Sequence, residues 1–292
     1  MGATEPTLGV IGGSGLYELE GLSDVETVQV TTPFGAPSDR VVRGKLGGAT
    51  LLFLPRHGRG HRIPPHRINY RANVFALKAL GAQQLVSVSA VGSLREEIHP
   101  GDMVLVDQFI DRTRQRASTF FDDCGVVAHV GFGDPTDPAL REALRAAVVA
   151  AGGRVHVGGT YVCMEGPQFS TRAESEMYRG LGAHVIGMTN LPEAKLAREA
   201  ELPYASLAMS TDYDCWHQSE ASVSVEAVVA VMHKNVGVAK NTLRALIERL
   251  PDPALSPASS ALAHAIITAP ASIAQETREL LSPLIGKYFP TE

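Results

Sequence analysis

Residues 206–216, SLAMSTDYDCW, join an apolar run to a pair of aspartates. The run from Tyr204 to Met209 is typical of a buried strand, and Asp212 and Asp214 follow it two positions apart. If the backbone stays extended there, both carboxylates point to one face, where two charges about 4 Å apart repel by roughly 4 kcal/mol. One member of such a pair holds a proton near neutral pH, so the pair both donates and accepts hydrogen bonds. A solvated acidic loop is the alternative that this pattern leaves open.

Apolar and amphipathic segments alternate along the rest of the chain, which predicts one α/β domain around a mixed, largely parallel sheet. Strands are expected at residues 8–11, 25–30, 41–43, 50–54, 85–90, 104–110, 158–164, 185–189 and 204–209, and helices at 68–80, 138–151, 171–181, 192–201 and 225–250. The domain is expected to span residues 1–250. The extension 251–292 begins with a Pro/Ser/Ala linker at 251–260 and continues with a helix at 273–284. That extension packs on the same domain or on a neighbouring subunit.

The composition excludes several classes of protein. The 292 residues are 45% hydrophobic and 20% charged, as in soluble globular proteins, and a formal net charge of -5 argues against a nucleic-acid partner. The three cysteines, Cys124, Cys163 and Cys215, are an odd number, which argues against a disulfide framework, and they form no C-x-x-C pair that would indicate zinc. Cys215 beside Asp214 is a candidate nucleophile, but no basic neighbour in the sequence supports it. Reduced thiols, no signal-peptide pattern and no membrane-spanning apolar run lead us to expect a cytoplasmic protein without a membrane partner.

Three stretches at expected strand ends suit an anion or the polar edge of a ligand. Residues 12–15, GGSG, let backbone N–H groups converge, and the Ser14 hydroxyl adds a donor. Residues 56–62, RHGRGHR, carry three arginines and two histidines, and the arginine fork suits phosphate. The third stretch, Ser89-Ala90, ends a strand where open α/β sheets place ligands. A tight turn and a solvated basic loop are the structural alternatives for the first two.

Together, the anion-binding stretches and the carboxylate pair predict a ligand with a phosphate at one end and a nitrogen-rich ring at the other. Phosphorolysis of an N-glycosidic bond needs this arrangement, because the base leaves with its electrons while an anion faces an oxocarbenium-like sugar. Neither the dinucleotide fingerprint nor the P-loop pattern is present in the glycine stretch, which disfavours an oxidoreductase or an NTPase.

Seven motifs carry a resemblance to a known family: GVIGGSGL, TPFGAPSD, RHGRGH, GSLREEIHPGDMVLVDQFIDRT, EGPQFSTRAES, PEAKLAREA and STDYDCW. In this order, over roughly residues 7–250, they resemble the motifs of the 5′-methylthioadenosine phosphorylases, which belong to the trimeric purine nucleoside phosphorylase family. The resemblance implies a single-domain fold with a barrel-like mixed sheet, a homotrimer, and a pentosyltransferase that uses inorganic phosphate as co-substrate without a metal or other cofactor. The implied reaction gives adenine and 5-methylthioribose 1-phosphate, in purine and methionine salvage.

The same resemblance implies roles for individual residues. The phosphate ligands would be Ser14, Arg56, His57, Ser89, the Ala90 amide and Thr189. Met188 would lie against the ribose and Phe169 against the base, with Ala90 nearby. Asp212 and Asp214 would face N7 and the 6-amino group, with Asp212 as the expected proton donor toward N7 and Asp214 supporting it.

Substrate specificity is also implied by the resemblance. Members that prefer 6-oxopurines carry asparagine in place of Asp212 and glutamate in place of Ser170, so adenine is expected. Val225 and Val228 would form an apolar wall for a 5′-methylthio group, and His129 would enter the pocket of a neighbouring subunit. The two valines, like Met188, would also suit a protein core. Adenosine or a 6-oxopurine nucleoside as substrate, and a non-catalytic purine-nucleoside sensor on the same scaffold, are the alternatives.

Overall fold

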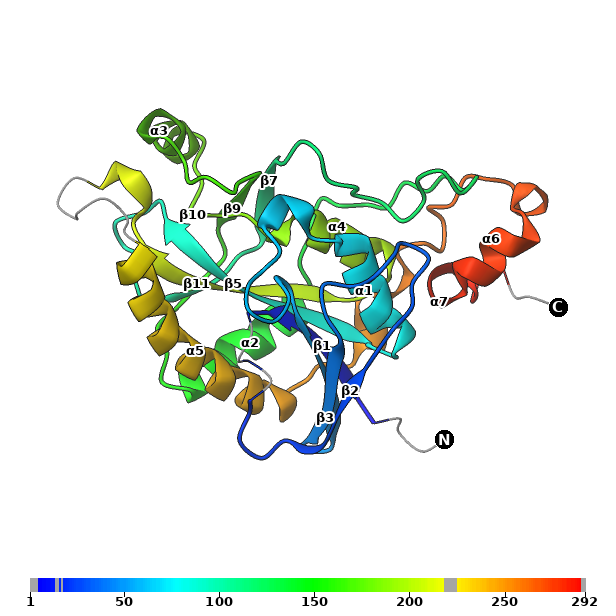
Figure 1. The fold of residues 1–292 in the computed structure, drawn as a ribbon, viewed down its shortest axis with the longest axis horizontal. Helices are drawn as coiled ribbons and strands as arrows, with labels where there is room; N and C mark the ends of the chain where they lie inside the picture. The colour runs from blue at the N-terminus through cyan, green and yellow to red at the C-terminus, as the bar shows by residue number, and fades with distance from the viewer. Residues whose placement is uncertain (1–4, 14–15, 17, 218–224, 290–292) are drawn as a thin grey trace.

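The computed structural model describes residues 5–13, 16, 18–217 and 225–289, with only the backbone of residues 225–228 and 230. A mixed sheet runs through the middle of the molecule, helices cover both of its faces, and the C-terminal segment projects at one end (Figure 1). The predicted α/β fold, a mixed sheet flanked by helices, is therefore confirmed. Among the described residues, no helix is both long enough and apolar enough to cross a membrane.

The described strands form one sheet, whose main path runs β2-β3-β4-β1-β5-β10-β9-β7. β11 leaves this path and pairs with β5 and β6, and β6 also pairs with β8. The strands are β1 (Thr7–Gly12), β2 (Ser23–Val28), β3 (Val41–Leu46), β4 (Ala49–Pro55), β5 (Gln84–Ser93), β6 (Met103–Leu105), β7 (Gln108–Arg112), β8 (Val155–Val157), β9 (Thr160–Met164), β10 (Val185–Gly187) and β11 (Tyr204–Asp212). Because β4, β1, β5 and β11 are parallel neighbours, their carboxyl ends meet at one edge of the sheet.

β5 and β11 form the centre of the sheet. Their parallel register runs from Tyr204 opposite Leu85 to Ser210 opposite Val91, and nearly all of both strands is buried. Strands covered on both faces show continuous runs of apolar and small residues rather than an alternating pattern. This is why residues 204–209 could be predicted as a buried strand from their composition.

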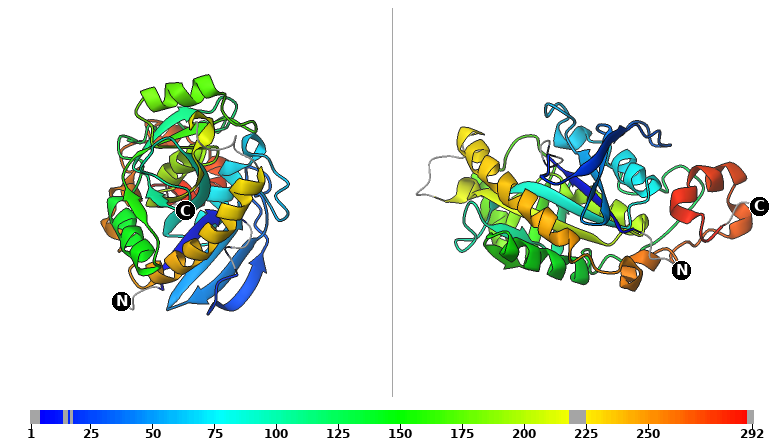
Figure 2. Two further views of the ribbon diagram at one scale, coloured as in Figure 1. Left: turned by 90° about the vertical axis from the view of Figure 1, so that its left-hand side faces the viewer. Right: turned by 90° about the horizontal axis from the view of Figure 1, so that it is seen from below.

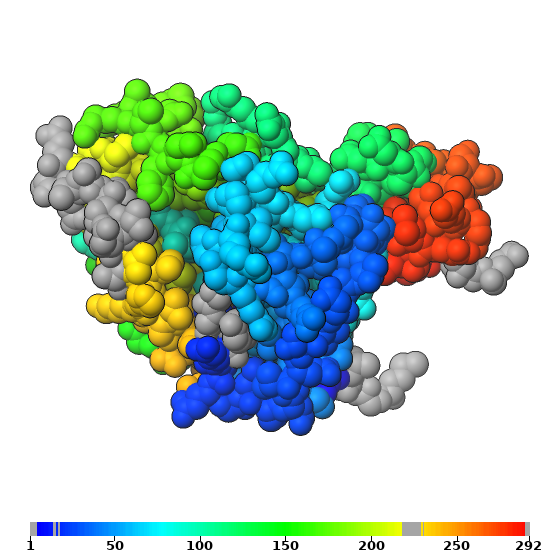
Figure 3. Space-filling model, in the orientation of Figure 1, coloured from blue at the N-terminus to red at the C-terminus, as the bar shows by residue number. Residues whose placement is uncertain are grey.

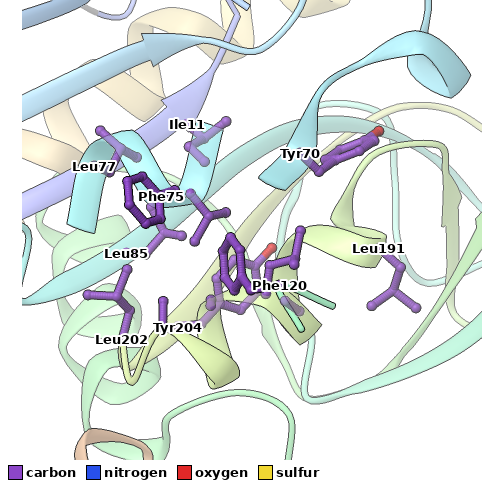
Figure 4. Close-up of a cluster of buried hydrophobic side chains, with 14 of the residues drawn as sticks. Ile11, Tyr70, Phe75, Leu77, Leu85, Phe120, Leu191, Leu202 and Tyr204 are labelled. Atoms are coloured by element: carbon purple, nitrogen blue, oxygen red, sulfur yellow. The ribbon is translucent and has the colours of Figure 1, made fainter. Parts of the chain in front are cut away.

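Helices cover the sheet in two layers (Figure 2). α2 and α5 pack against each other over one face, on a core of aliphatic side chains that includes Leu144 and Leu243. α1 and α4 cover the other face, where Phe75 and Phe120 lie close to Leu85 of the sheet (Figure 4). The helices are α1 (Tyr70–Ala79), α2 (Pro138–Ala150), α3 (Arg172–Gly180), α4 (Asn190–Glu199), α5 (Val225–Ile247), α6 (Gln275–Leu280) and α7 (Ser282–Ile285).

The apolar run at residues 104–110 is not the single strand that its sequence predicts. It divides into β6, which pairs with β11 and β8, and β7, which pairs with β9. The division occurs at Asp107, whose N–H donates to the Gly159 carbonyl while its carboxylate accepts from the Gly159 N–H at 3.0 Å. The apolar pattern of a sequence indicates which residues are buried. Because the chain stays largely buried where it changes strand partners, the pattern does not show the boundary between β6 and β7.

The C-terminal extension also differs in detail from the prediction. The expected linker holds two short 3-10 turns, η3 (Pro253–Leu255) and η4 (Pro257–Ser260), and the expected helix at 273–284 is divided into α6 and α7. Pro283 in the first turn of α7 has no N–H, so one continuous helix cannot pass through it. The segment packs against the rest of the chain (Figure 3), with the Tyr288 hydroxyl 2.6 Å from the buried Glu201 carboxylate.

Candidate active site

A cavity of about 310 Å³ opens where the parallel strands of the sheet end. This edge is the place where open α/β sheets bind ligands. The lining comes from every strand that ends there and from α5: Gly13, Leu16, Arg56, His57, His61, Pro65, Val88, Ser89, Ala90, Val91, Gly92, Met164, Phe169, Ile186, Gly187, Met188, Thr189, Met209, Thr211, Asp212, Asp214, Met232 and Val236.

Asp212 and Asp214 line this cavity together, but not because the strand stays extended. The register of β11 against β5 shifts between Ser210 and Asp212, a bulge that redirects the strand end. Asp214 has a φ of 53° at the start of the 3-10 turn η2 (Asp214–Trp216), and its N–H donates to Asp212 Oδ1 at 2.8 Å. Both side chains lie over Gly92 of β5, where an added Cβ would be 3.0 Å from Asp212 Oδ1. The predicted juxtaposition is present, and a bulge and a turn produce it.

The two carboxylates have different environments. Asp212 Oδ1 accepts from the Asp214 N–H, and the Thr211 hydroxyl lies 2.7 Å from Asp212 Oδ2. Asp214 Oδ2 is buried without a hydrogen-bond partner among the described groups. Burial raises the pKa of Asp214, and the charge of Asp212 raises it further. These environments favour Asp214 as the member of the pair that holds the proton, although the sequence analysis names Asp212 as the expected donor.

The cavity is cationic near Val88, four residues before Gly92 on β5, because Arg56 contacts Val88. Arg56 is 2% exposed and pairs with Glu193 of α4, which is 1% exposed. Nε donates to Glu193 Oε2 at 3.0 Å, and Nη2 reaches Glu193 Oε1, the Ile11 carbonyl and the Ser87 hydroxyl. Nη1 donates to the Val88 carbonyl at 3.1 Å, which uses one of its two N–H groups. The second Nη1 N–H is the part of this guanidinium suited to an anion in the cavity.

His57 lies beside Arg56 and is neutral at physiological pH. Its Nδ1 is 2.8 Å from the Ile63 carbonyl, and a carbonyl only accepts, so Nδ1 carries the hydrogen and Nε2 carries the lone pair. Burial, followed by the charges of Arg56 and His61, lowers the pKa of His57 from 6.5 to about 4, while the Ile63 bond acts in the other direction. The ring stacks on His61, with centroids 4.2 Å apart. Such a ring can accept a hydrogen bond from hydrogen phosphate.

Between the two ends, the last residues of β5 face the start of α4. The Ser89 hydroxyl donates to Asn190 Oδ1 at 3.1 Å, and both residues are buried. Thr189 immediately precedes α4, and its N–H points to the Tyr161 hydroxyl at 3.5 Å. Ser89, Ala90 and Thr189 all line the cavity near Arg56 and His57, as the predicted phosphate site requires.

The middle of the cavity is apolar and rich in methionine. Phe169, which is 57% exposed, and Met188 line it as expected. Met164, Met209 and Met232 also line it, so the cavity takes four of the seven methionines in the chain. The sequence analysis did not identify these three because an isolated methionine has no local pattern that distinguishes a ligand cavity from an ordinary hydrophobic core. Thioether side chains are soft and fill irregular space, which suits an apolar ligand group.

Five further predicted residues are not part of the described lining. Ser170 is buried behind the cavity, with its hydroxyl 3.6 Å from the Met164 sulfur. His129 lies beside the C-terminal segment, where its N–H donates to the Ala265 carbonyl. The side chains of Val225 and Val228 are outside the described residues, although α5 supplies Met232 and Val236 to the same cavity. Ser14 also lies outside the described residues, next to the lining residue Gly13.

The cavity thus combines a cationic end, an apolar middle and a carboxyl pair, and similarity to known proteins agrees with this chemistry. A family model described as "Phosphorylase superfamily" matches residues 7–248. The chain is 57% identical over 285 residues to the S-methyl-5′-thioadenosine phosphorylase of Geobacter sulfurreducens, covering 97% of this chain and 99% of the relative. The chain belongs to the phosphorylase superfamily, within the methylthioadenosine phosphorylase family.

Other members of this family are also similar over most of the chain. The S-methyl-5′-thioadenosine phosphorylase of Koribacter versatilis is 54% identical, over 97% of this chain and 96% of the relative. A methylthioadenosine phosphorylase from an antarctic soil metagenomic library has a TM-score of 0.90 and 47% identity, over 96% of this chain and 99% of that one. The methylthioadenosine phosphorylase of Schistosoma mansoni in complex with adenine has a TM-score of 0.79 and 39% identity, covering 83% of this chain and 91% of that one.

We predict that Gly92→Ala lowers both the turnover of the enzyme and its stability. The added Cβ would lie 3.0 Å from Asp212 Oδ1 and 3.2 Å from Ile186 Cγ2, so Asp212 must move. Turnover should fall at least about tenfold, with an unfolding cost of about 1–3 kcal/mol. Kinetics and urea unfolding measure the two effects, and Gly237→Ala, in an exposed helical position with open space around it, is the matched control. Full turnover in Gly92→Ala would contradict the geometry described for Asp212.

We also predict a histidine contribution to acid destabilisation. His57 binds a proton with a pKa of about 4 in the folded state and 6.5 in the unfolded state, so the unfolded state binds more protons between these values. Stability therefore falls as the pH drops from about 6.5 to about 4, by up to about 3 kcal/mol from this group. The variant His57→Asn tests this contribution, because its amide N–H can still donate to the Ile63 carbonyl and its side chain does not titrate.

The unfolding free energy of His57→Asn, measured in phosphate-free buffer, should depend less on pH than the unfolding free energy of the wild type. An equal slope in both proteins would refute the assignment, and His264→Asn at an exposed position is the control.

Proposed function

We propose that the protein catalyses the phosphorolysis of 5′-methylthioadenosine, giving adenine and 5-methylthioribose 1-phosphate. The observation that carries the proposal is the arrangement of one cavity, with Arg56, His57 and Thr189 at one end and Asp212 and Asp214 at the other. The relatives named above agree with this substrate. Inorganic phosphate is the co-substrate, and no other cofactor is part of the proposal.

At the carboxyl end, the pair recognises the base and assists its departure. Desolvation and the charge of Asp212 raise the pKa of Asp214, and we propose that its protonated form donates toward N7 of adenine as the bond between N9 and C1′ breaks. The bonding electrons pass to the purine, and the proton neutralises the charge that develops there. Asp212, held by the Asp214 N–H and in contact with the Thr211 hydroxyl, accepts from the 6-amino group. A 6-oxo group has no hydrogen to donate, so this pair favours adenine over hypoxanthine.

At the cationic end, the protein orients phosphate toward C1′ on the side opposite the base. The Nη1 group of Arg56, the Thr189 hydroxyl and the Ala90 amide bind phosphate oxygens, with Ser14 as a further expected donor. The Ser89 hydroxyl joins them when its one hydrogen turns from Asn190 Oδ1 to the phosphate. His57 Nε2 accepts the hydrogen of hydrogen phosphate, which directs an unprotonated oxygen to the sugar. A phosphate oxygen forms the new bond to C1′ as the glycosidic bond breaks, and its negative charge stabilises the oxocarbenium-like sugar.

The apolar middle of the cavity accounts for the 5′ substituent. Met232 and Val236 of α5 line it, and neither offers a hydrogen bond to a 5′-hydroxyl. A methylthio group gains from burial against these side chains, at roughly 0.8 kcal/mol for each CH₂ equivalent. Val225 and Val228 precede them on the same helix and are proposed to extend this wall. Ser170, behind the Met164 wall of the cavity, is proposed to favour adenine because it lacks the carboxylate that oxopurine enzymes would carry there.

Assembly and location complete the proposal. We propose a cytoplasmic homotrimer in which His129 of each subunit reaches the cavity of its neighbour. In support, His129 lies away from the cavity of its own chain, beside the exposed apolar side chains of Val127 and Ile267. Sedimentation of the purified protein at several concentrations tests the trimer directly.

A phosphate-dependence assay decides the reaction. Adenine release from 5′-methylthioadenosine should require phosphate, follow saturation in phosphate and be matched by an equal amount of sugar 1-phosphate. Adenosine should react more slowly and inosine hardly at all. Adenine release without phosphate would identify a hydrolase, a preference for inosine would contradict the assigned roles of the aspartates, and tight binding without turnover would identify a sensor.

We predict different pH profiles for Asp212→Asn and Asp214→Asn. Each substitution should remove about 2–4 kcal/mol of transition-state stabilisation. This loss is measured as a decrease in kcat/KM for 5′-methylthioadenosine. Because Asp214 must be protonated to act, wild-type kcat/KM should fall as the pH rises through the raised pKa of Asp214. Asp212→Asn should keep this alkaline limb and Asp214→Asn should lose it. The reverse result would place the proton on Asp212.

A further inference from the structure

Arg116 is a buried arginine outside the cavity lining, in the irregular segment between β7 and α2. Its side chain is 2% exposed, and its guanidinium lies 5.4 Å from the centre of the Tyr70 ring. Arg112 and Arg114, its neighbours in that segment, are exposed.

The guanidinium binds the turn that carries Thr189. Nη1 donates to the carbonyls of Met188 and Leu191, each at 2.7 Å. These carbonyls lie on either side of Thr189 and Asn190, so the two bonds hold both ends of the turn. Met188 and Thr189 line the cavity at the predicted ribose and phosphate positions.

The same group also holds two other walls of the cavity. Nη2 donates to the carbonyls of Met164 and Glu165, at 3.2 and 2.7 Å, and Nε donates to the Glu165 carboxylate at 3.1 Å. Nη1 also reaches the Tyr70 hydroxyl at 3.0 Å, which in turn donates to the Pro65 carbonyl at 3.0 Å. Pro65, Met164 and Met188 all line the cavity, so one cation connects the backbones of three lining residues.

This network uses the whole guanidinium. An arginine side chain has five N–H groups in a planar fork, and six acceptors surround this one, counting the Tyr70 hydroxyl. A lysine has three donors on one atom and cannot reach acceptors on opposite sides of the fork. The Glu165 carboxylate supplies the compensating charge that a buried cation requires.

We propose that Arg116 is a positioning residue that preorganises the phosphate and ribose half of the active site. The inference rests on the proposed phosphorolysis and adds a residue to it. Its bonds to the carbonyls of Met188 and Leu191 come from within the protein, so they fix the Met188–Leu191 turn independently of contacts to substrate. The carboxyl pair lies on β11 and η2, which none of these bonds reaches, so the base half of the cavity should not depend on Arg116.

The test is Arg116→Lys, with Arg114→Lys as the matched control at an exposed position in the same segment. Arg116→Lys should raise the KM for phosphate at least tenfold and lower kcat at least tenfold. Its affinity for adenine alone, measured by calorimetry, should stay within twofold of the wild type. The control should match the wild type in all three quantities. Equal losses of phosphate and adenine binding in Arg116→Lys would indicate general unfolding and overturn the inference, as would unchanged kinetics.

A second variant keeps the inference testable if lysine destabilises the fold. Arg116→Ala leaves a cavity of guanidinium shape, so guanidinium chloride at tens of millimolar should restore part of the lost kcat and the KM for phosphate. Sodium chloride at the same ionic strength should restore neither. Absence of rescue in a folded Arg116→Ala protein would contradict the proposal. Wild-type protein without phosphate-dependent activity would contradict the proposed function instead, so the two failures are distinguishable.

Discussion

The buried ion pair between Arg56 and Glu193 is the interaction on which the active site depends most. It joins the end of β4 to α4, and the same guanidinium reaches carbonyls of β1 and β5. Glu193 also accepts from the Tyr204 hydroxyl of β11 at 3.2 Å. Removing one partner of a buried ion pair typically destabilises the fold by about 3–5 kcal/mol, because the other charge stays buried with neither its partner nor water to compensate it. Replacing both partners with apolar side chains could preserve the fold, but it would remove the cation from the anion end of the cavity. The proposed binding of phosphate therefore accounts for a charge at this buried position.

A second constraint is that the two ends of the cavity come from parallel neighbours of the same sheet. β1, β4, β5 and β11 end at one edge, so residues separated by more than 150 positions meet without a dedicated connection. The sheet brings Asp212 close to the edge, and the bulge after Ser210 then turns the side chain over Gly92. The position of the carboxyl pair therefore depends on two features, the register of β11 against β5 and the bulge after Ser210.

The two halves of the site were predictable to different degrees. Arg56, His57, Asp212 and Asp214 could be identified because each lies in a short stretch with an unusual local pattern directly after an apolar strand. Met164, Met209 and Arg116 could not, because their roles depend on groups far away in the sequence. Arg116 binds the carbonyl of Met188, 72 residues along the chain, and no local pattern marks such a pair. The division of the run at 104–110 was missed for the same reason.

By itself, the sequence determined the α/β class, the buried strand that ends in Asp212 and the chemical character of both ends of the cavity. These properties follow from periodicity, side-chain chemistry and spacing along the chain, which are local. Only the tertiary structure decided which aspartate has a buried oxygen without a hydrogen-bond partner, which tautomer His57 adopts and which arginine binds the walls of the cavity. Those properties depend on burial and on hydrogen bonds between distant segments, and they arise only when the chain has closed around its sheet.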